Sequence, residues 1–306
     1  MKYVQLPQTD LNVSRIALGC MRIAGKTTDE VEVLVKKALE LGINFFDHAD
    51  IYGGGRSEEL FGEVLKRNPE LRQKMILQTK CSIIPGKMYD LSKEHILSSV
   101  DKSLARLNTD YVDVLLLHRP DALFEPQEVA EAFDELYAAK KVRWFGVSNF
   151  TPGQIRLLQK YSKHPIVINQ LQLSIVHSVM IDSGLNMNMK EDWAQDKDGG
   201  VLDFCRLNDI TIQAWSIVQA SWAEGSFISN PSYEKLNTVL QKLGAKYGVS
   251  SNAIAAAWIL RHPAGIQAIT GTTSPAHLED TARAADICLT REEWYSLYMS
   301  SGKPLP

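Results

Sequence analysis

The sequence has few of the residues that mark an exported or metal-binding protein. Its four cysteines are scattered, with no C-x-x-C pair, and no pair of histidines lies at metal-ligand spacing. Disulfide scaffolds and zinc sites need such patterns, so we expect neither a disulfide framework nor a bound metal. The default for Cys20, Cys81, Cys205 and Cys288 is a reduced, buried thiol in a cytoplasmic protein.

Long hydrophobic runs are also missing. The longest apolar run, residues 253–260, is far shorter than the roughly 20 residues that cross a membrane as a helix. Residues 1–15 lack the apolar region of a secretory signal. We therefore expect a soluble protein that is not exported and has no membrane partner.

Neither sign of charge dominates. Lys and Arg number 33 and Asp and Glu 36, for a formal net charge of -3, so the positive excess of nucleic-acid-binding proteins is absent. No Gly/Ser-rich or Pro-rich linker, charge block or low-complexity tract interrupts the chain. Its 306 residues would suit two domains of about 150, but barrels commonly reach about 250 residues or more as one unit. We predict a single domain over residues 1–306.

Two familiar nucleotide-binding motifs are absent as well. Gly19 and Gly25 enclose five residues, whereas the phosphate-binding loop before Lys-Ser/Thr encloses four. The glycines at 53–55 do not begin a G-x-G-x-x-G motif, because Glu58 stands where the third glycine belongs. These observations exclude a phosphate-loop kinase and a Rossmann fold.

A regular alternation of strand and helix signals is present. Strands alternating with helices call for parallel strands joined by helical crossovers, and eight such units close a barrel. We predict an α/β fold, the (β/α)8 TIM barrel, with an open doubly wound sheet as the alternative. The expected strands, rich in β-branched, aromatic or other apolar residues, are residues 16–19, 43–47, 75–80, 111–118, 143–148, 166–173, 211–216 and 266–270.

Capping residues predict where helices begin. Thr27 and Glu30 have the spacing of a capping box, and Gly42 supplies the stop of that first helix. A hydroxyl cap or a proline in the first turn marks a helix start in the same way. Further helices are expected to begin at Ser57, Ser92, Pro126 and Thr151-Pro152.

Three segments fall outside the eight units. Residues 2–14 predict an N-terminal hairpin that caps the barrel, with its turn at residues 8–10. The segment from Glu292 onward predicts a C-terminal helix and loop. Residues 177–200 follow the sixth strand and are too polar for a core, so we expect a substrate loop there.

Side chains that carry chemistry gather where the predicted strands end. Active sites of such barrels lie at the carboxyl ends of the strands, and neighbouring strands are about 4.8 Å apart. Asp47 ends the second strand, with Tyr52 shortly after it; Lys80 ends the third strand and His118 the fourth. Each residue alone is also explained by capping, packing or solvation. Together they predict one pocket.

These four groups have a chemical use in one pocket. A phenol with a reference pKa of about 10 is a poor acid near pH 7. The Lys80 cation would lower the pKa of Tyr52, Asp47 would hold Lys80, and His118 would orient a carbonyl. A different enzyme class stays open, because Lys80 could instead form a Schiff base with a carbonyl substrate, as in an aldolase.

With these motifs in order along the chain, the sequence resembles the aldo/keto reductase superfamily, in its bacterial oxidoreductase branch. FDHADIYGGGRSEELFGEVL is similar to the family's Asp and Tyr signature, LQTK to its lysine motif, LLLHRPD to its histidine motif, and VRWFGVSNF with INQ to its nicotinamide-carboxamide site. The resemblance implies a catalytic tetrad of Asp47, Tyr52, Lys80 and His118, with Tyr52 as the acid. It implies hydride transfer from a reduced nicotinamide nucleotide to an aldehyde or ketone, reversible with the alcohol.

The resemblance also implies an extended cofactor rather than one bound on a Rossmann turn. Ser148, Asn149 and Gln170 would hold the carboxamide, and a two-sided amide does need such donors and acceptors. Trp215 would stack on the nicotinamide, and Ser216 and its neighbours would meet the pyrophosphate. The full set expected to bind the cofactor is Met21, Asp47, Ser148, Asn149, Gln170, Trp215, Ser216, Ile217, Gly271, Thr272, Thr273, His277 and Asp280.

The choice between NADP and NAD depends on the segment after the eighth strand. Residues 271–273 are followed by Ser274-Pro275, which suits a helix N-terminus and so a phosphate. Many relatives carry a cation here for the adenosine 2′-phosphate, whereas this segment offers His277 accompanied by Glu279 and Asp280. We expect NADP as the cofactor, with NAD as the alternative.

The expected partner is a small carbonyl compound, bound by a monomer or a weak homo-oligomer. Met21 stands where many relatives have a pocket tryptophan, which leaves the substrate open. A third interpretation is a nicotinamide-binding regulatory subunit without enzyme activity, since a similar fold serves voltage-gated potassium channels as a β subunit. The sequence shows no partner-binding appendage.

Overall fold

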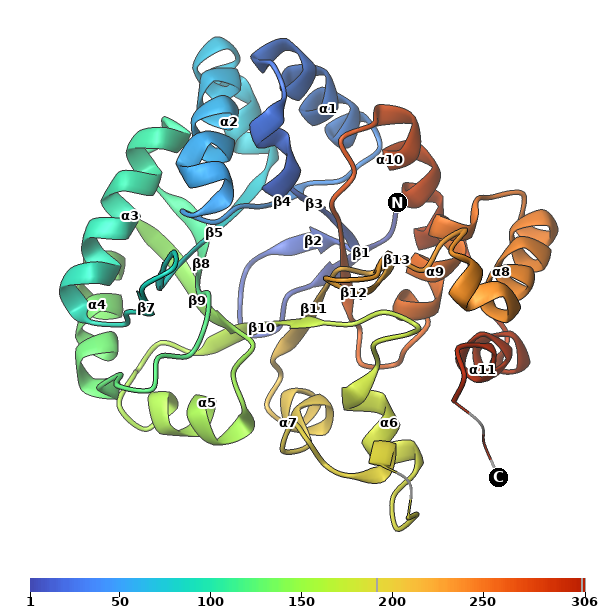
Figure 1. Ribbon diagram of the computed structural model, residues 1–306. Coiled ribbons are helices and arrows are strands. Elements are labelled where there is room, and N and C mark those ends of the chain that lie inside the picture. The colour runs from blue at the N-terminus through green and yellow to red at the C-terminus, as the bar shows by residue number, and fades with distance from the viewer. Residues whose placement is uncertain (191, 304, 306) are drawn as a thin grey trace.

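Eight parallel strands close into a barrel in the order β3-β4-β5-β8-β9-β10-β11-β14, with helices around it (Figure 1). The computed structural model describes residues 1–190, 192–303 and 305. Each barrel strand coincides with one predicted segment to within two residues at either end, so the predicted (β/α)8 TIM barrel is confirmed. The strands are β3 (Ile16–Gly19), β4 (Phe45–Asp47), β5 (Ile76–Cys81), β8 (Val112–Leu117), β9 (Val142–Ser148), β10 (Ile166–Gln172), β11 (Thr211–Trp215) and β14 (Gln267–Thr270).

The helices begin close to the predicted caps. The Thr27–Glu30 capping box is present, and the hydroxyls of Ser92 and Thr151 cap two further helices. The helix expected at Ser57 begins one residue earlier, at Arg56. The helices are α1 (Thr28–Glu40), α2 (Arg56–Arg67), α3 (Lys93–Leu107), α4 (Pro126–Ala138), α5 (Pro152–Gln159), α6 (Val179–Leu185), α7 (Val201–Leu207), α8 (Glu234–Tyr247), α9 (Ser251–Leu260), α10 (Pro275–Ala282) and α11 (Arg291–Ser300).

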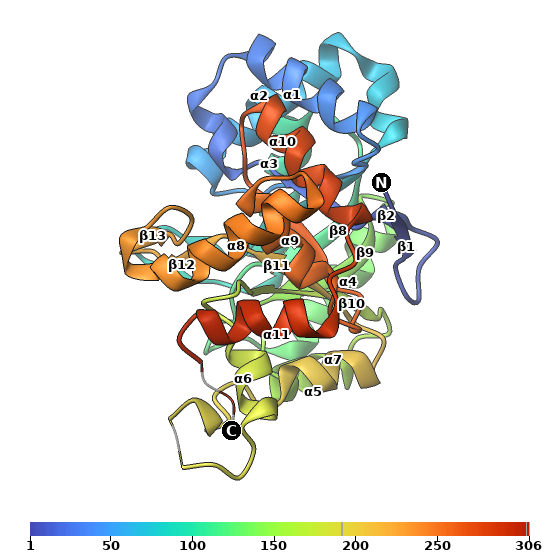
Figure 2. The ribbon, with the colours of Figure 1, turned by 90° about the vertical axis from the view of Figure 1, so that its right-hand side faces the viewer.

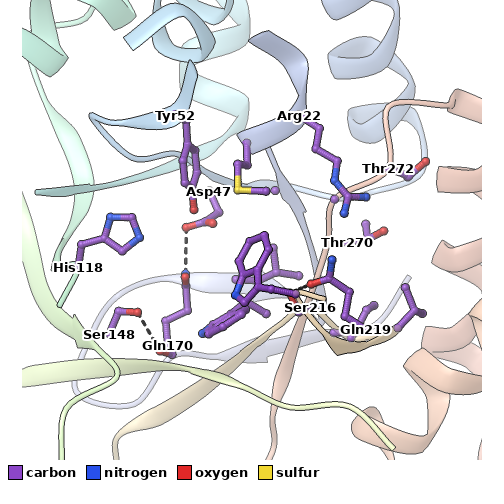
Figure 3. Close-up of a pocket in the computed structure, with 18 of the residues that line it drawn as sticks. Arg22, Asp47, Tyr52, His118, Ser148, Gln170, Ser216, Gln219, Thr270 and Thr272 are labelled. Carbon is purple, nitrogen blue, oxygen red and sulfur yellow. Dashed lines mark hydrogen bonds between the residues drawn. The ribbon is translucent and has the colours of Figure 1, made fainter. Parts of the chain in front are cut away.

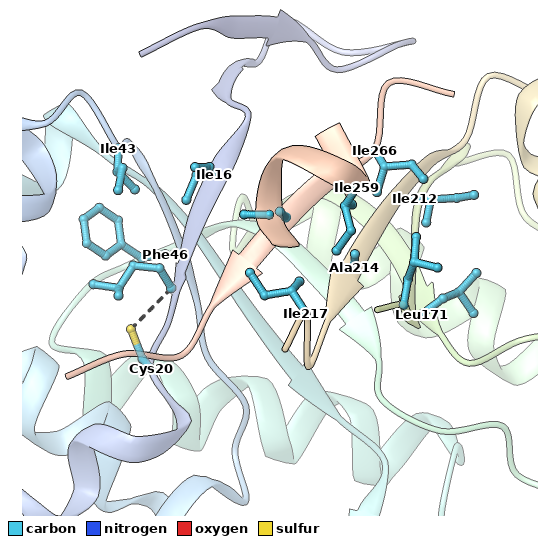
Figure 4. Close-up of a cluster of buried hydrophobic side chains, with 14 of the residues drawn as sticks. Ile16, Cys20, Ile43, Phe46, Leu171, Ile212, Ala214, Ile217, Ile259 and Ile266 are labelled. Carbon is cyan, nitrogen blue, oxygen red and sulfur yellow. Dashed lines mark hydrogen bonds between the residues drawn. The ribbon is translucent and has the colours of Figure 1, made fainter. Parts of the chain in front are cut away.

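Alternate residues of the strands build two separate cores. Ala17 packs inside the barrel, while its neighbours Ile16 and Leu18 belong to the larger core that includes helix side chains. Figure 4 shows part of this larger core, with Ile212 and Ala214 of β11 near Ile259 of α9. The period of two follows from the pleat of a strand, and because both faces of the strands are covered, most barrel-strand residues are buried.

A hairpin closes one end of the barrel. Strands β1 (Tyr3–Gln5) and β2 (Asn12–Ser14) pair antiparallel, and Leu6 and Val13 are fully buried against the inner core residues Phe45 and Val114. The predicted N-terminal cap is therefore confirmed. Figure 2 shows this hairpin on the side opposite to a second one, β12 (Gln219–Ser221) with β13 (Gly225–Ser226). The first end is sealed, which leaves the second for a site.

The C-terminal helix α11 packs on the outside of the barrel. Its Trp294 stacks on Trp258 of α9 with ring centroids 4.8 Å apart, and each indole N–H donates to the other residue's carbonyl oxygen. The predicted C-terminal helix is thus present.

No helix in the described part of the chain is both long and apolar enough to cross a membrane. Cys20, Cys81 and Cys205 are buried free thiols, but Cys288 is exposed, so its predicted burial is wrong.

Candidate active site

A cavity of about 650 Å³ opens at the carboxyl ends of the barrel strands (Figure 3). Most of the residues predicted for the site line it, although they come from seven different strand ends or the loops that follow them. Three predicted residues, Lys80, Thr273 and Asp280, do not. Those that do are Met21, Asp47, Tyr52, His118, Ser148, Asn149, Gln170, Trp215, Ser216, Ile217, Gly271, Thr272 and His277.

Lys80 lies beneath the cavity floor and connects the other charged groups. Its side chain is fully buried, and its Nζ donates to Asp47 Oδ1 at 2.7 Å and to the Tyr52 hydroxyl at 3.0 Å. A third hydrogen bond, of 2.7 Å, goes to the carbonyl oxygen of His48. All three ammonium protons are therefore used, and the phenol of Tyr52 is the member of this group that meets the cavity together with Asp47.

Glycines hold Tyr52 in this position. Gly53 and Gly54, directly after it, have φ of 60° and 66°. This is the left-handed conformation, which is strained for a residue that carries a side chain. A Cβ on Gly53 would also lie 2.3 Å from the Cβ of Ala24. The chain can therefore turn directly after Tyr52, and the loop of residues 21–25 can pack closely against this turn.

Three effects, not all in the same direction, act on the acidity of Tyr52. Burial raises the pKa of the phenol, the Lys80 charge lowers it, and Asp47 raises it again. The net direction is upward, so Lys80 acts as predicted but does not bring the pKa of Tyr52 below its ordinary value. Tyr52 consequently keeps its proton near neutral pH and can donate it.

The neighbours of Tyr52 have fixed charge states. Burial lowers the pKa of Lys80, but Asp47 and Tyr52 outweigh it and the net shift is upward, so Lys80 is a cation. Burial, and then the charges of Lys80 and Arg119, lower the pKa of His118 well below its usual range. His118 is therefore a neutral imidazole, edge-on to the Tyr52 ring at 6.0 Å. It can give one N–H to an oxygen beside the phenol.

A chain of glutamines anchors Asp47 from inside the barrel. Gln78 and Gln170 each donate to Asp47 Oδ1, at 2.6 and 3.0 Å, and each also donates to Gln213. Gln213 donates in turn to Gln267, whose amide reaches the carbonyl of Ser14. This buried network fixes the carboxylate without supplying a second cation.

One side of the cavity presents amide-binding groups. Asn149 donates to Ser148 Oγ at 2.7 Å, and Ser148 donates to the carbonyl of Gln170 at 2.9 Å. The side-chain oxygens of Asn149 and Gln170 accept no hydrogen bond from any described residue, so both are available to the NH2 group of an amide. Trp215 lines the same cavity. This set fits a flat ring that carries a carboxamide.

The opposite side of the cavity presents phosphate-binding groups. Ser274 caps α10 and Pro275 follows it, as predicted, and Thr272 and His277 line the cavity there. Arg22, which follows β3, extends into the same space across from Thr272 and Gln219 (Figure 3). No cation was expected between Gly271 and Ala282 in the sequence, and the fold supplies one from a different loop.

The sequence model of the aldo/keto reductase family matches residues 15–298. The chain belongs to this family. A solved structure of a thermostable aldo-keto reductase, Tm1743, in complex with the inhibitor epalrestat covers 98% of this chain and 100% of its own, with a TM-score of 0.78 and 28% identity. The predicted family and enzyme class are therefore confirmed. Aldo/keto reductases are oxidoreductases that use nicotinamide cofactors.

Two curated aldo/keto reductase relatives share one name. A 6-dehydroglucose reductase of Novosphingobium aromaticivorans is 36% identical and aligns over 99% of this chain and 96% of its own. A 6-dehydroglucose reductase of Agrobacterium fabrum is 35% identical and aligns over 94% of each chain. The similarity extends over the whole reductase barrel rather than one motif.

Two predicted cofactor contacts of this reductase are placed elsewhere. Asp280 accepts hydrogen bonds from the amide and hydroxyl of Ser250, at the start of α9, and so serves a helix cap. Thr273 faces a separate depression on the surface. Residues 177–200, the predicted substrate loop, contain α6, and none of its described residues lines the cavity.

Several lining residues were missed from the sequence. They include Arg22, Arg119, Gln219, Trp222, Asn252 and Thr270. Most follow or end a barrel strand, so listing every polar residue near a strand end would have found Arg22, Arg119 and Thr270. Trp222 lies on the turn between β12 and β13, whose path over the cavity has no signal in the sequence.

Proposed function

We propose that this chain is an NAD(P)H-dependent carbonyl reductase in which Tyr52 is the general acid. The observation that carries the proposal is the buried Lys80, whose Nζ joins Asp47 to the Tyr52 hydroxyl at 3.0 Å. Tyr52 would give its proton to the carbonyl oxygen during reduction and take one from the alcohol in reverse. General acid catalysis of this kind contributes about 10² to 10⁴ in rate.

His118 would position the carbonyl for that proton transfer. Its neutral imidazole lies beside Tyr52, and Nδ1 is buried without a partner among the described residues. An unprotonated Nδ1 without a partner is cheaper than an orphaned N–H, which favours the tautomer with hydrogen on Nε2. That N–H and the Tyr52 hydroxyl would then share the substrate oxygen.

The residues present fit a nicotinamide dinucleotide. When bound, the cofactor supplies the hydride. The free oxygens of Asn149 and Gln170 match its carboxamide, and Trp215 offers a flat face for the ring. Arg22, Thr272 and the cap of α10 match its phosphates.

We propose NADP as the preferred cofactor, with NAD as the alternative. Arg22 supports a dinucleotide rich in phosphate, and His277 lines the cavity beside Thr272. The two acids that could repel a 2′-phosphate have other partners: Asp280 caps α9, and Glu279 forms an ion pair with Lys37 at 3.0 Å. With both acids engaged in this way, the proposal of NADP meets less opposition from negative charge beside the cavity.

The Schiff-base alternative loses support from the position of Lys80. Its Nζ is fully buried, uses all its protons in hydrogen bonds and does not line the cavity. A carbonyl compound in the cavity would contact Tyr52 and His118, which line it, rather than Lys80.

We also propose that residues 1–306 act as one domain in the cytoplasm, as a monomer or weak homo-oligomer. Free thiols in a single barrel support this assignment.

A panel of aldehydes and ketones tested with NADPH and with NADH in parallel checks the proposal. It includes 6-dehydroglucose, because two relatives carry that substrate in their names. We expect cofactor oxidation that depends on the carbonyl compound, with NADPH used in preference to NADH. Tight cofactor binding with negligible turnover across the panel would favour the regulatory-subunit interpretation instead.

A further inference from the structure

Arg119 lies at the end of the cavity where the reaction would take place. It directly follows His118 after β8 and lines the cavity. Its main chain is fixed on both sides by the buried Ser82: the Arg119 amide donates to Ser82 Oγ at 2.9 Å, and that hydroxyl donates to the Arg119 carbonyl at 3.1 Å. The base of the side chain is therefore held rigidly beside the imidazole.

The guanidinium of Arg119 has no acidic partner among the described residues. The nearest acid in sequence, Asp121, accepts instead from the amides of Leu91 and Leu123, at 3.1 and 2.8 Å. Of the acids that the structure describes, Asp47 is the one that lines the cavity, and it already accepts a hydrogen bond from Lys80. The described cavity wall therefore carries uncompensated positive charge, although the whole protein has a formal net charge of -3.

Arg119 is not placed to serve the cofactor phosphates. Arg22 and Thr272 follow β3 and β14, which pair with each other. Arg119 follows β8, which is separated from β3 by β4 and β5 in the barrel order. Figure 3 accordingly shows His118 and Arg22 on opposite sides of Asp47. A second anion would have to enter at the Tyr52 end, and the substrate is the molecule that reaches it.

We propose that Arg119 binds an anionic group of the substrate, so that the preferred substrates are aldehydes or ketones bearing a carboxylate or a phosphate. The inference rests on the proposed reductase function and names the substrate class of the same site. A guanidinium presents paired donors that match either anion. Ile51, Ile83 and Trp222 line the cavity as well and would contact the carbon chain between the anion and the carbonyl.

Matched substrate pairs test the proposal. Succinic semialdehyde is compared with butanal, and glyceraldehyde 3-phosphate with glyceraldehyde, by kcat/KM with saturating NADPH. We expect the wild type to prefer the anionic member of at least one pair, and the preferred pair identifies the anion. Arg119→Met should lower kcat/KM for that anionic member about tenfold to a hundredfold, the usual size of a charge-assisted contact. The neutral member should change less than about threefold.

Lys87→Met is the matched control. Lys87 is an exposed cation on the turn between β6 (Ile83–Ile84) and β7 (Met88–Tyr89) and does not line the cavity. Removing it changes the net charge equally, and we expect the preference for the anion to be unchanged. In the wild type, the anionic member's kcat/KM should also fall as salt rises.

The outcomes separate this inference from the function on which it rests. Turnover of neutral and anionic members with equal kcat/KM, or an equal loss for both in Arg119→Met, would overturn the role of Arg119 and leave the reductase intact. Absence of turnover with every carbonyl compound would overturn the reductase function itself, and the inference with it.

Discussion

At the scale of single residues, Lys80 contacts both Asp47 and Tyr52, and Lys80 and Asp47 shift the pKa of Tyr52 in opposite directions. Burial raises the pKa of Tyr52, the Lys80 charge lowers it, and Asp47 raises it again. The positions of Asp47, Tyr52 and Lys80 predict that they meet, because the adjacent strands β4 and β5 end there. The net direction of the shift could not be predicted, because it depends on how completely the fold excludes water from the phenol.

Two substitutions should move the pKa of Tyr52 in opposite directions. Lys80→Met removes the cation and leaves Asp47 unpaired, so the pKa of Tyr52 should rise, and alcohol oxidation, which needs Tyr52 as a base, should require a higher pH. Asp47→Asn removes an effect that raises the pKa, so the oxidation profile should move to lower pH. Tyrosinate absorbance titrated in both folded variants measures the shift without turnover. Shifts in the same direction would contradict the account.

Arg22 and Arg119 show what residue patterns leave out. Arg22 has no recognisable spacing with the tetrad, and Arg119, although it directly follows His118, was assigned no role from the sequence; both line the cavity because each follows a strand end. The sequence places Thr272 and His277 correctly near one another, since they share a helix start. It cannot show that the loop after β3 brings Arg22 opposite them, because that path depends on the packing of residues 21–25 against the Gly53 turn.

At the scale of elements, close helix packing fixes the strands that hold the tetrad. Helix α2, which follows the Tyr52 loop, packs on α3, and Glu58 pairs with Arg106 across them at 2.7 Å. Periodicity and caps predict both helices well because their buried faces are continuous. The hairpin β12–β13 and the helix α6 were not predicted, because short polar segments take their shape from tertiary contacts.

Gly62 allows the approach of α2 to α3. A Cβ there would lie 1.9 Å from the carbonyl oxygen of Arg106 and 2.8 Å from the carbonyl carbon of Leu107. Gly62→Ala should therefore lower the free energy of unfolding by about 1 to 3 kcal/mol, although alanine is the better helix former. Denaturant unfolding measures it.

Gly153→Ala is the control for this effect. Gly153 lies in α5, and a Cβ there would have its nearest neighbour at 4.0 Å. The same substitution should be neutral or stabilise by up to about 1 kcal/mol. Equal effects at Gly62 and Gly153 would show that the α2–α3 contact is not tight.

At the scale of the whole molecule, buried neutral histidine makes the barrel sensitive to acid. His48 is fully buried, both ring nitrogens lack a partner among the described residues, and burial followed by the Lys80 charge lowers its pKa to about 3. The unfolded chain binds a proton at His48 near pH 6.5 and the folded chain does not. The stability that His48 contributes is therefore present above about pH 6.5 and is lost as the pH falls.

His48→Leu should remove this dependence, since the imidazole makes no hydrogen bond that leucine would lose. Between pH 7.5 and pH 5.0 the wild type should lose about 2 kcal/mol more unfolding free energy than the variant, because each pKa unit corresponds to about 1.4 kcal/mol. Urea unfolding at both pH values measures the difference. Parallel losses in the two proteins would mean that His48 is protonated or solvated in the folded state.

The central claim is that Tyr52 supplies the proton in carbonyl reduction, and Tyr52→Phe tests it most directly. The variant keeps the ring and the hydrophobic packing but removes the hydroxyl that Lys80 contacts at 3.0 Å. Steady-state turnover with NADPH and the best carbonyl substrate, together with the NADPH dissociation constant from tryptophan fluorescence, should be measured on both proteins. Turnover should fall by about 10² to 10⁴ or more, while cofactor affinity changes less than about tenfold. Near-normal turnover in Tyr52→Phe would contradict the account.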